Sequence, residues 1–139
     1  MAVALYLADT SVWARLAQPA VRGAIEPRIE RGLVGTCPIV DLEILYSVRS
    51  GAEHDHFSAR RRAFEYFPLT DEIAQRAIEV QNLLAHGAQH RSVSIPDLII
   101  AATAERFGLT VLHYDDDYTR IAMITGQPVE WVVPRGTAD

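Results

Sequence analysis

The segment IPDLIIAATAERFGLTVLHYDDDY, residues 95–118, places a helix, a stop and a strand in direct succession. Pro96 suits the first turn of a helix, where its missing N–H would have no partner, and an acid such as Asp97 is favoured by the partial positive charge there. Gly108 is typical of a helix end. The six residues that follow, LTVLHY, form a strand pattern. The segment therefore predicts a helix that leads directly into a strand of an α/β fold.

The same alternation of strand and helix patterns extends outward over the whole chain. Strand patterns lie at residues 3–8, 33–37, 65–69, 109–114 and 129–133. Helical patterns lie at residues 10–18, 20–31, 38–49, 55–64, 71–86, 97–107 and 115–123. This order predicts a three-layer α/β sandwich, in which helices flank a largely parallel central sheet. A length of 139 residues is typical of one domain, and we expect a single domain over residues 1–139.

Composition narrows the class of protein. Hydrophobic residues make up 49% of the chain, enough for a substantial core, and the opening MAVALYLA is too short to span a bilayer or to act as a secretory signal. Cys37 is the only cysteine, so no internal disulfide forms and the cytoplasm is the expected location. A net charge of −5 argues against a broad basic surface for nucleic acid. All 13 basic residues are arginines, which excludes chemistry that needs a lysine.

Acidic residues recur where predicted strands end and helices begin. Asp9 follows the first strand, Asp115–Asp117 follow LTVLHY, and Asp97 opens a helix whose start belongs at the same edge. Glu43 lies just over one turn into the helix after the second strand. In open α/β sheets, ligands bind outside the carboxyl ends of the strands. We therefore expect these carboxylates to meet at one edge of the sheet.

A cluster of carboxylates needs protons or cations, because like charges repel at short range. The natural partner is a hard divalent cation such as Mg²⁺, which prefers oxygen ligands and often binds substrate phosphate as well. Such ions activate water and stabilise the leaving oxygen of a phosphodiester. The pattern therefore predicts metal-assisted hydrolysis of nucleic acid.

Each acid also has a simpler local explanation. Asp9 can cap the first helix, Asp97 can match a helix dipole, and Asp115–Asp117 can form a turn. Asp41 competes with Glu43 for the same role, since apolar residues surround both. Only the joint placement at strand ends favours a common site.

With these segments in place, the chain resembles the PIN-domain ribonucleases, in particular the VapC-like toxins of bacterial toxin–antitoxin pairs. The resemblance rests on LADTSVW at residues 7–13, VDLEILYS at residues 40–47, residues 95–115, and DDDY followed by TRIA. It covers nearly the whole chain in length and motif order. It implies a PIN-like sandwich and an endoribonuclease that depends on Mg²⁺ or Mn²⁺.

The resemblance also implies roles for individual residues. The acids of the family fall on Asp9, Glu43, Asp97 and Asp115, as catalytic groups and metal ligands, and on Asp117 as a further metal ligand. Asp116 occupies the variable middle position of Asp-x-Asp. The small hydroxyl residue near the metal is Thr10 or Ser11, of which we favour Ser11.

Two protein partners are implied in the same way, a cognate antitoxin and a second copy of the chain in a homodimer. An arginine on the tail of the antitoxin can neutralise the acidic cluster in place of metal. No membrane partner is expected.

The remaining charged residues have less specific patterns. Arg60–Arg62 are expected on a solvated helix face, with contact to an RNA backbone as the alternative, and Arg15 is another candidate for substrate contact. His54 and His56 lie two positions apart on a predicted helix, face different ways and so do not predict a metal site.

His113 either fills its strand or touches substrate. The apolar residues predict packing. Trp13 is expected in the core or in a dimer interface, Trp131 in the core together with Val129 and Val133, and Cys37 as a small buried hydrophobe.

Two other functions compete. A phosphoacceptor receiver domain or an aspartate-nucleophile phosphatase also places acids at strand ends, but both normally hold the phosphoryl group with a lysine, which this chain lacks. A non-catalytic PIN-like module that only binds a protein partner would carry the acidic cluster as an electrostatic cost. Stabilisation by Mn²⁺ or Mg²⁺ separates this module from the nuclease.

Overall fold

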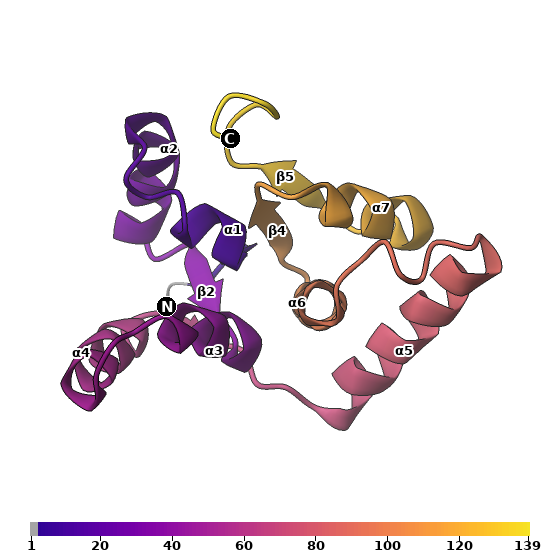
Figure 1. Ribbon diagram of the computed structural model, residues 1–139, viewed down its shortest axis with the longest axis horizontal. Helices are drawn as coiled ribbons and strands as arrows, with labels where there is room; N and C mark the ends of the chain where they lie inside the picture. Colours follow the sequence, from indigo (N-terminus) through magenta and orange to yellow (C-terminus); the bar gives the residue numbers. More distant parts are fainter. Residues whose placement is uncertain (1–2) are drawn as a thin grey trace.

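A single parallel sheet organises the chain in the computed structural model, which describes residues 3–139 (Figure 1). Within that range the strands are β1 (Tyr6–Ala8), β2 (Val34–Thr36), β3 (Glu65–Tyr66), β4 (Thr110–His113) and β5 (Val129–Trp131). They are all parallel and lie in the order β3-β2-β1-β4-β5. The central strands β1 and β4 pair through Leu7 with Val111 and Ala8 with Leu112.

Helices cover both faces of this sheet. In the described residues they are α1 (Thr10–Trp13), α2 (Pro19–Glu30), α3 (Pro38–Tyr46), α4 (Gly51–Arg61), α5 (Asp71–His86), α6 (Ile95–Phe107) and α7 (Asp116–Thr125). Figure 1 shows α6 end-on in the middle of the molecule, between α3 and α5. The predicted sandwich of helices around a parallel sheet is confirmed.

Alternating residues of β1 and β4 supply the two halves of the core. Leu7 and Val111 point to one side, where they join a cluster that includes residues of α3, α5, α6 and α7. Ala8 and Leu112 point to the other side and pack in a second cluster with Val12 of α1 and residues of α2. Both faces of the central strands are therefore buried, which leaves their carboxyl ends as the place for polar groups.

Local capping explains where several helices begin and end. The Thr70 hydroxyl accepts a hydrogen bond from the Ile73 amide at 3.3 Å and caps the start of α5, the helix expected at residues 71–86. Gly108 and Gly126 end α6 and α7 with φ of 69° and 71°, a left-handed conformation that glycine adopts without strain. The helix predicted at residues 10–18 is shorter in the structure and ends at Trp13; turns follow at residues 14–17, and Gln18 is extended before Pro19, as expected for a residue that precedes proline.

The start of α4 was predicted too late in the sequence. Its cap is Ser50, whose hydroxyl accepts a hydrogen bond from the Glu53 amide at 3.1 Å. The order Ser-x-x-Glu at residues 50–53 is a capping-box pattern, so the helix begins at Gly51 and not at residue 55. The helix before it ends correspondingly early, at Tyr46.

Two predictions about side-chain burial were wrong. Arg61 is not on a solvated face, since it is 8% exposed and donates to Oδ1 of Asp41 at 3.0 Å. Trp131 is only half-buried, and the buried residue of the last segment is its neighbour Val132. Cys37 is buried as expected, and burial raises the pKa of its thiol to about 11. No helix in residues 3–139 is both long and apolar enough to cross a membrane.

Candidate active site

Five carboxylates from distant parts of the sequence line one cavity of about 320 Å³. Asp9 directly follows β1, and Asp115 lies two residues after β4, so the parallel pairing of these strands places both at one edge. Asp97 and Asp117 lie in the first turns of α6 and α7, and Glu43 reaches the cavity from α3. The same cavity, called the acidic cavity below, is also lined by Thr10 and Ser11.

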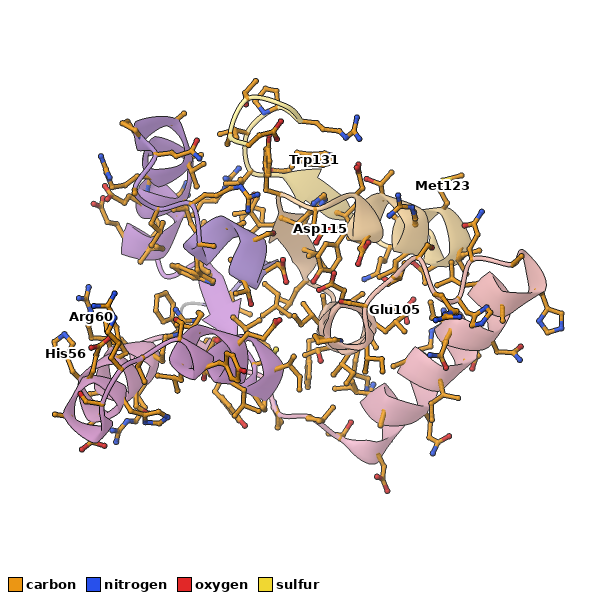
Figure 2. All side chains as sticks on the ribbon, in the orientation of Figure 1. His56, Arg60, Glu105, Asp115, Met123 and Trp131 are labelled. Atoms are coloured by element: carbon orange, nitrogen blue, oxygen red, sulfur yellow. The ribbon has the colours of Figure 1, made fainter. Side chains whose placement is uncertain are left out.

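Three of these acids converge more closely than the rest. One carboxylate oxygen each from Asp97, Asp115 and Asp117 lie within 4.8 Å of one another. Figure 2 places Asp115 in the middle of the molecule, between α1 and α7. Asp97 is only 7% exposed. Such spacing leaves the negative charges poorly separated unless a proton or a cation lies among them.

The buried hydroxyl of Tyr118 joins Asp9 to Asp97. It lies 2.7 Å from Oδ1 of Asp9 and 3.1 Å from Oδ1 of Asp97. A hydroxyl has one proton to donate, so it cannot satisfy both carboxylates at once. Burial and the nearby acids raise the pKa of Tyr118 well above its usual value, which keeps the phenol protonated as a donor. Tyr118 belongs to the DDDY motif of residues 115–118, but nothing in the sequence pattern indicates this role for its hydroxyl.

The electrostatics of the cavity favour protonation of Asp97 when no cation is present. Burial raises the pKa of Asp97 to about 9, and a hydrogen bond to Asp117 and the charges of Asp9 and Asp115 act in the same direction. Burial also raises the pKa of Asp115, with the charges of Asp117 and Asp9 adding to it.

Two of the acids also cap helices, as their local explanation suggested. Oδ2 of Asp9 accepts from the Ser11 amide at 3.0 Å, at the start of α1. Oδ1 of Asp115 accepts from the Asp117 amide at 2.9 Å, at the start of α7. Capping orients each carboxylate, and in each case a second oxygen remains for other contacts. The two explanations are therefore compatible.

The structure separates Glu43 from Asp41. Oε1 of Glu43 accepts from Thr10 Oγ1 at 2.9 Å inside the acidic cavity, and burial raises its pKa, with the charge of Asp9 adding to the shift. Asp41 instead receives hydrogen bonds from Thr36 at 2.6 Å and Arg61 at 3.0 Å. Asp41 therefore belongs to a structural ion pair outside the cavity.

Asp116 also points away from the acidic cavity. Its two oxygens accept from Arg135 at 2.8 and 2.7 Å, and this hydrogen-bonded pair lowers the pKa of Asp116. Its neighbours Asp115 and Asp117 face the cavity while Asp116 does not. This matches the alternation implied by the family pattern Asp-x-Asp.

Of the residues predicted near the metal or the substrate, Ser11 lines the acidic cavity and Arg15 lies outside it. Ser11 accepts from the Tyr114 amide at 2.9 Å, and this contact ties α1 to the end of β4 within the acidic cavity. Arg15 does not line that cavity. It donates to the carbonyls of Ala138 and Ser11 at 3.0 and 2.9 Å, and its guanidinium lies 4.6 Å from the centre of the Tyr114 ring.

His113 helps to position Asp115 from within the core. It is fully buried, and its Nδ1 accepts from the Asp115 amide at 3.2 Å, which helps to place that acid. Burial lowers the pKa of His113 to about 4, so the ring is neutral. In residues 3–139, the group of side chains close enough together to bind a metal ion is Asp97, Asp115 and Asp117, and it contains no histidine. His56 lies in the middle of α4, far from Asp115 in Figure 2.

The side chains present fit a hard divalent cation. The donors are all carboxylate or hydroxyl oxygens, which Mg²⁺ and similar ions prefer. Among the described residues, no arginine forms an ion pair with Asp9, Asp97 or Asp115, and Asp117 pairs with Arg120 at 3.2 Å. A cation would therefore neutralise charge that this part of the chain leaves uncompensated.

Comparisons with known proteins agree with this geometry. The family model described as the PIN domain matches residues 6–123. Ribonuclease VapC21 of Mycobacterium tuberculosis is 52% identical over 134 residues, which cover 96% of this chain and 97% of that one. Ribonuclease VapC51 of the same species is 48% identical over the same shares of both chains.

Solved structures share the fold at lower sequence identity. VapBC from Salmonella typhimurium, described as DNA bound, has a TM-score of 0.75 at 16% identity and covers 94% of this chain and 100% of that one. FitAcB from Neisseria gonorrhoeae has a TM-score of 0.71 at 19% identity, over 91% of this chain and 97% of that one. The chain belongs to the PIN-domain family, and within it to the VapC-like proteins.

Proposed function

We propose that this PIN-domain protein is an endoribonuclease that acts as the toxin of a toxin–antitoxin pair and hydrolyses RNA phosphodiesters with Mg²⁺ or Mn²⁺. The observation that carries the proposal is the convergence of Asp97, Asp115 and Asp117 within 4.8 Å, in a chain 52% identical to a ribonuclease. The catalytic unit is taken as a single domain over residues 1–139, located in the cytoplasm.

The chain's own side chains have distinct tasks in this proposal. Asp9, Asp97, Asp115 and Asp117 hold the cation, with Glu43 beside them. When bound, the cation activates water and offsets charge on the scissile phosphate. The Tyr118 hydroxyl keeps Asp9 and Asp97 in place through its short contacts to both.

Glu43 is suited to accept a proton from the attacking water. Thr10 occupies its Oε1 and fixes the orientation of the carboxylate, which leaves the other oxygen for water. Burial raises the pKa of Glu43 above its ordinary value, which makes its carboxylate a stronger base. Ser11 holds the ends of α1 and β4 together and thereby sets the spacing of the acids on either side.

The direct test is cleavage of RNA by the purified protein in millimolar Mn²⁺ or Mg²⁺, with EDTA as the metal-free control. Asp97→Asn should abolish cleavage and leave the circular dichroism spectrum unchanged. Asp55→Asn, on the exposed face of α4, removes one carboxylate far from the cavity and should cleave at the normal rate. Equal cleavage by wild type and Asp97→Asn would overturn the proposal.

A largely apolar groove of about 670 Å³ supports the proposed antitoxin partner. It runs between α1, α2, α3 and α4, and its apolar lining is Trp13, Leu16, Ile29, Ile44, Phe57, Ala63 and Phe64, with the charged side chains of Arg22, Glu26, Arg60 and Arg61 among them. Such a groove suits the apolar face of a partner helix. An arginine on the same partner would then neutralise the acidic cavity in place of the cation. One solved structure that shares this fold, at 19% sequence identity, is described as a toxin–antitoxin complex from Klebsiella pneumoniae.

A homodimer would cover a second apolar surface, on α3, α5 and α6. Leu42 and Tyr46 on α3 are 64% and 91% exposed, and Ile78 on α5 and Ile95 on α6 are also exposed. Helix α6 lies between α3 and α5 in Figure 1 and contacts both of them. Exposed apolar residues grouped in this way are typical of a protein interface. Tyr46→Glu should convert the dimer to a monomer in light-scattering measurements, and a wild-type monomer would refute the dimer.

A further inference from the structure

A second cavity, of about 550 Å³, adjoins the acidic cavity. The two share Asp115, which lines both. The second cavity, called the arginine cavity below, is otherwise characterised by three arginines and two aromatic rings, Arg15, Arg120, Arg135, Tyr114 and Trp131. Figure 2 shows Trp131 close to Asp115, on the side of the C-terminal segment.

The two rings form a fixed wall of this cavity. Trp131 on β5 is in register with His113 on β4, and its ring centre lies 4.8 Å from that imidazole. The Tyr114 ring meets Trp131 edge-on at 5.3 Å. Because Trp131 is held by these neighbours and is only partly buried, its exposed part offers a rigid apolar surface to a ligand. An aromatic ring held in this way is the usual platform for an unpaired base.

Two of the arginines are available for exchange with a phosphate. Arg135 is 68% exposed and forms two hydrogen bonds with Asp116, which is itself 39% exposed. Arg120 is 41% exposed and pairs with Asp117 at 3.2 Å. Exposed pairs of this kind contribute little net stability, so a phosphate can replace either carboxylate at low cost. Guanidinium groups bind phosphate oxygens with the same two-pronged geometry.

The charge of the cavity depends on the acids that it shares. Its three arginines face Asp115, Asp116 and Asp139, so the lining is neutral by formal count. If Asp115 is engaged by a cation in the acidic cavity, the remaining lining carries a positive excess. The surface beside the proposed reaction centre is then suited to an anion with an aromatic group, which describes a nucleotide.

We propose that the arginine cavity binds the nucleotide next to the scissile phosphate of single-stranded RNA, with its base against Trp131 and its phosphate on Arg135. This inference rests on the proposed function, because it places the reacting phosphate at the acidic cavity. The strand is single because a base inside a duplex cannot stack on a protein ring. Because Asp115 lines both cavities, one RNA strand can occupy both of them with neighbouring nucleotides.

The first test compares three single variants in RNA cleavage kinetics, and compares the same substitutions in the Asp97→Asn background for binding of a single-stranded RNA hexamer. Arg135→Ala should raise KM about fivefold to tenfold with kcat unchanged, and should lower the slope of log affinity against log salt by about 0.7. Asp116→Asn frees Arg135 and should lower KM. Arg106→Ala removes a similarly exposed, paired arginine at the far end of α6 and should change neither quantity.

Trp131 provides an independent measurement. Trp131→Leu should weaken hexamer binding by about tenfold, because it removes the stacking surface. Trp131→Phe keeps an aromatic ring and should restore most of the affinity. A thermal melt of each variant shows whether the fold is intact. Equal losses for Leu and Phe in folded proteins would refute stacking as the cause.

The outcomes distinguish this inference from the proposed function. Cleavage by wild type with the same KM for Arg135→Ala and Arg106→Ala overturns the inference and leaves the nuclease standing. Hexamer binding that depends on Arg135, without any cleavage by wild type, supports the cavity and overturns the nuclease. If neither binding nor cleavage occurs, both fall. If Arg135→Ala weakens only the hold of a co-expressed antitoxin, the cavity binds protein and the inference is wrong.

Discussion

The hydroxyl of Tyr118 lies 2.7 Å from Oδ1 of Asp9, across 109 positions of sequence. The same oxygen lies 3.1 Å from Oδ1 of Asp97. One buried donor therefore contacts two acids that lie far apart in the sequence. Because the phenol has a single proton, the second carboxylate is satisfied only when a proton or a cation joins the cluster. The position of Tyr118 therefore favours the binding of a proton or a cation beside Asp9 and Asp97.

Removal of this hydroxyl tests its role. Tyr118→Phe leaves two buried carboxylate oxygens without their shared donor, at a cost of about 1–3 kcal/mol in the free energy of unfolding of the metal-free protein. Cleavage should fall about tenfold, since Asp9 and Asp97 lose their fixed orientation. Urea unfolding and initial cleavage rates measure the two effects. Tyr66→Phe, on an exposed ring of the edge strand β3, should change neither.

The pKa of Asp97 predicts how stability depends on pH. Its folded value of about 9 lies above its ordinary value of 3.8, so between these values the folded state holds a proton that the unfolded state has released. The contribution to stability is complete below pH 3.8 and is lost as pH rises toward 9. The contribution of Asp97 should therefore make metal-free protein in EDTA unfold at a lower urea concentration at pH 8.5 than at pH 6.

Asp97→Asn is the control for this dependence, because an amide of the same shape does not titrate. The variant should show a flatter profile of urea midpoint against pH. Mn²⁺ should reverse the trend in the wild type, since a cation competes with the proton and binds more tightly as pH rises. A wild-type profile as flat as that of the variant would show that Asp97 is not protonated in the folded protein.

Asp41 and Glu43 should respond to substitution in opposite ways. Asp41→Asn breaks a largely buried pair with Arg61 and should lower the free energy of unfolding by about 2 kcal/mol, while the folded protein keeps its cleavage activity. Glu43→Gln should leave the melting temperature nearly unchanged and reduce kcat by at least about a hundredfold. Melting curves and cleavage rates on the same preparations separate the two residues. The reverse pattern would move the site to Asp41.

How much of this site the sequence could predict depended on how local each signal was. Asp9, Asp97 and Asp115 follow from neighbouring residues, because strand ends and helix starts are visible in short patterns. The choice between Asp41 and Glu43 could not be made from neighbouring residues, since it depends on Arg61, twenty positions after Asp41. The family pattern supplied a preference for Glu43, and the geometry places it in the cavity.

Tyr118 and Trp131 show the same limit for aromatic residues. The helical spacing of Tyr118 is that of an ordinary core residue, and nothing in its neighbours indicates that its hydroxyl meets Asp9. Trp131 alternates with two valines and so matches the pattern of a buried strand face, whereas the short strand leaves it partly exposed beside Asp115.

The start of α4 is different, because its signal, the capping box from Ser50 to Glu53, is local and present in the sequence.

The proposed toxin activity predicts an effect in cells. Expression of the protein alone should arrest growth of a bacterial host, and Asp9→Ala, present at equal level, should not. The expected cause is RNA cleavage, so mapping of RNA 5′ ends after a pulse of expression should show new ends only with the wild type. Equal arrest by both forms would assign the toxicity to something other than the acidic cavity.

Metal binding itself is the most direct test of the account. In a thermal melt at pH 7.5, millimolar Mn²⁺ should raise the melting temperature of the wild type by several degrees, because a ligand that binds only the folded state stabilises it. Asp97→Asn and Asp115→Asn should lose most of this shift, and Asp55→Asn should keep it. A wild-type melting temperature that does not respond to Mn²⁺ or Mg²⁺ at any concentration up to about ten millimolar would contradict the assignment of these carboxylates as a cation site.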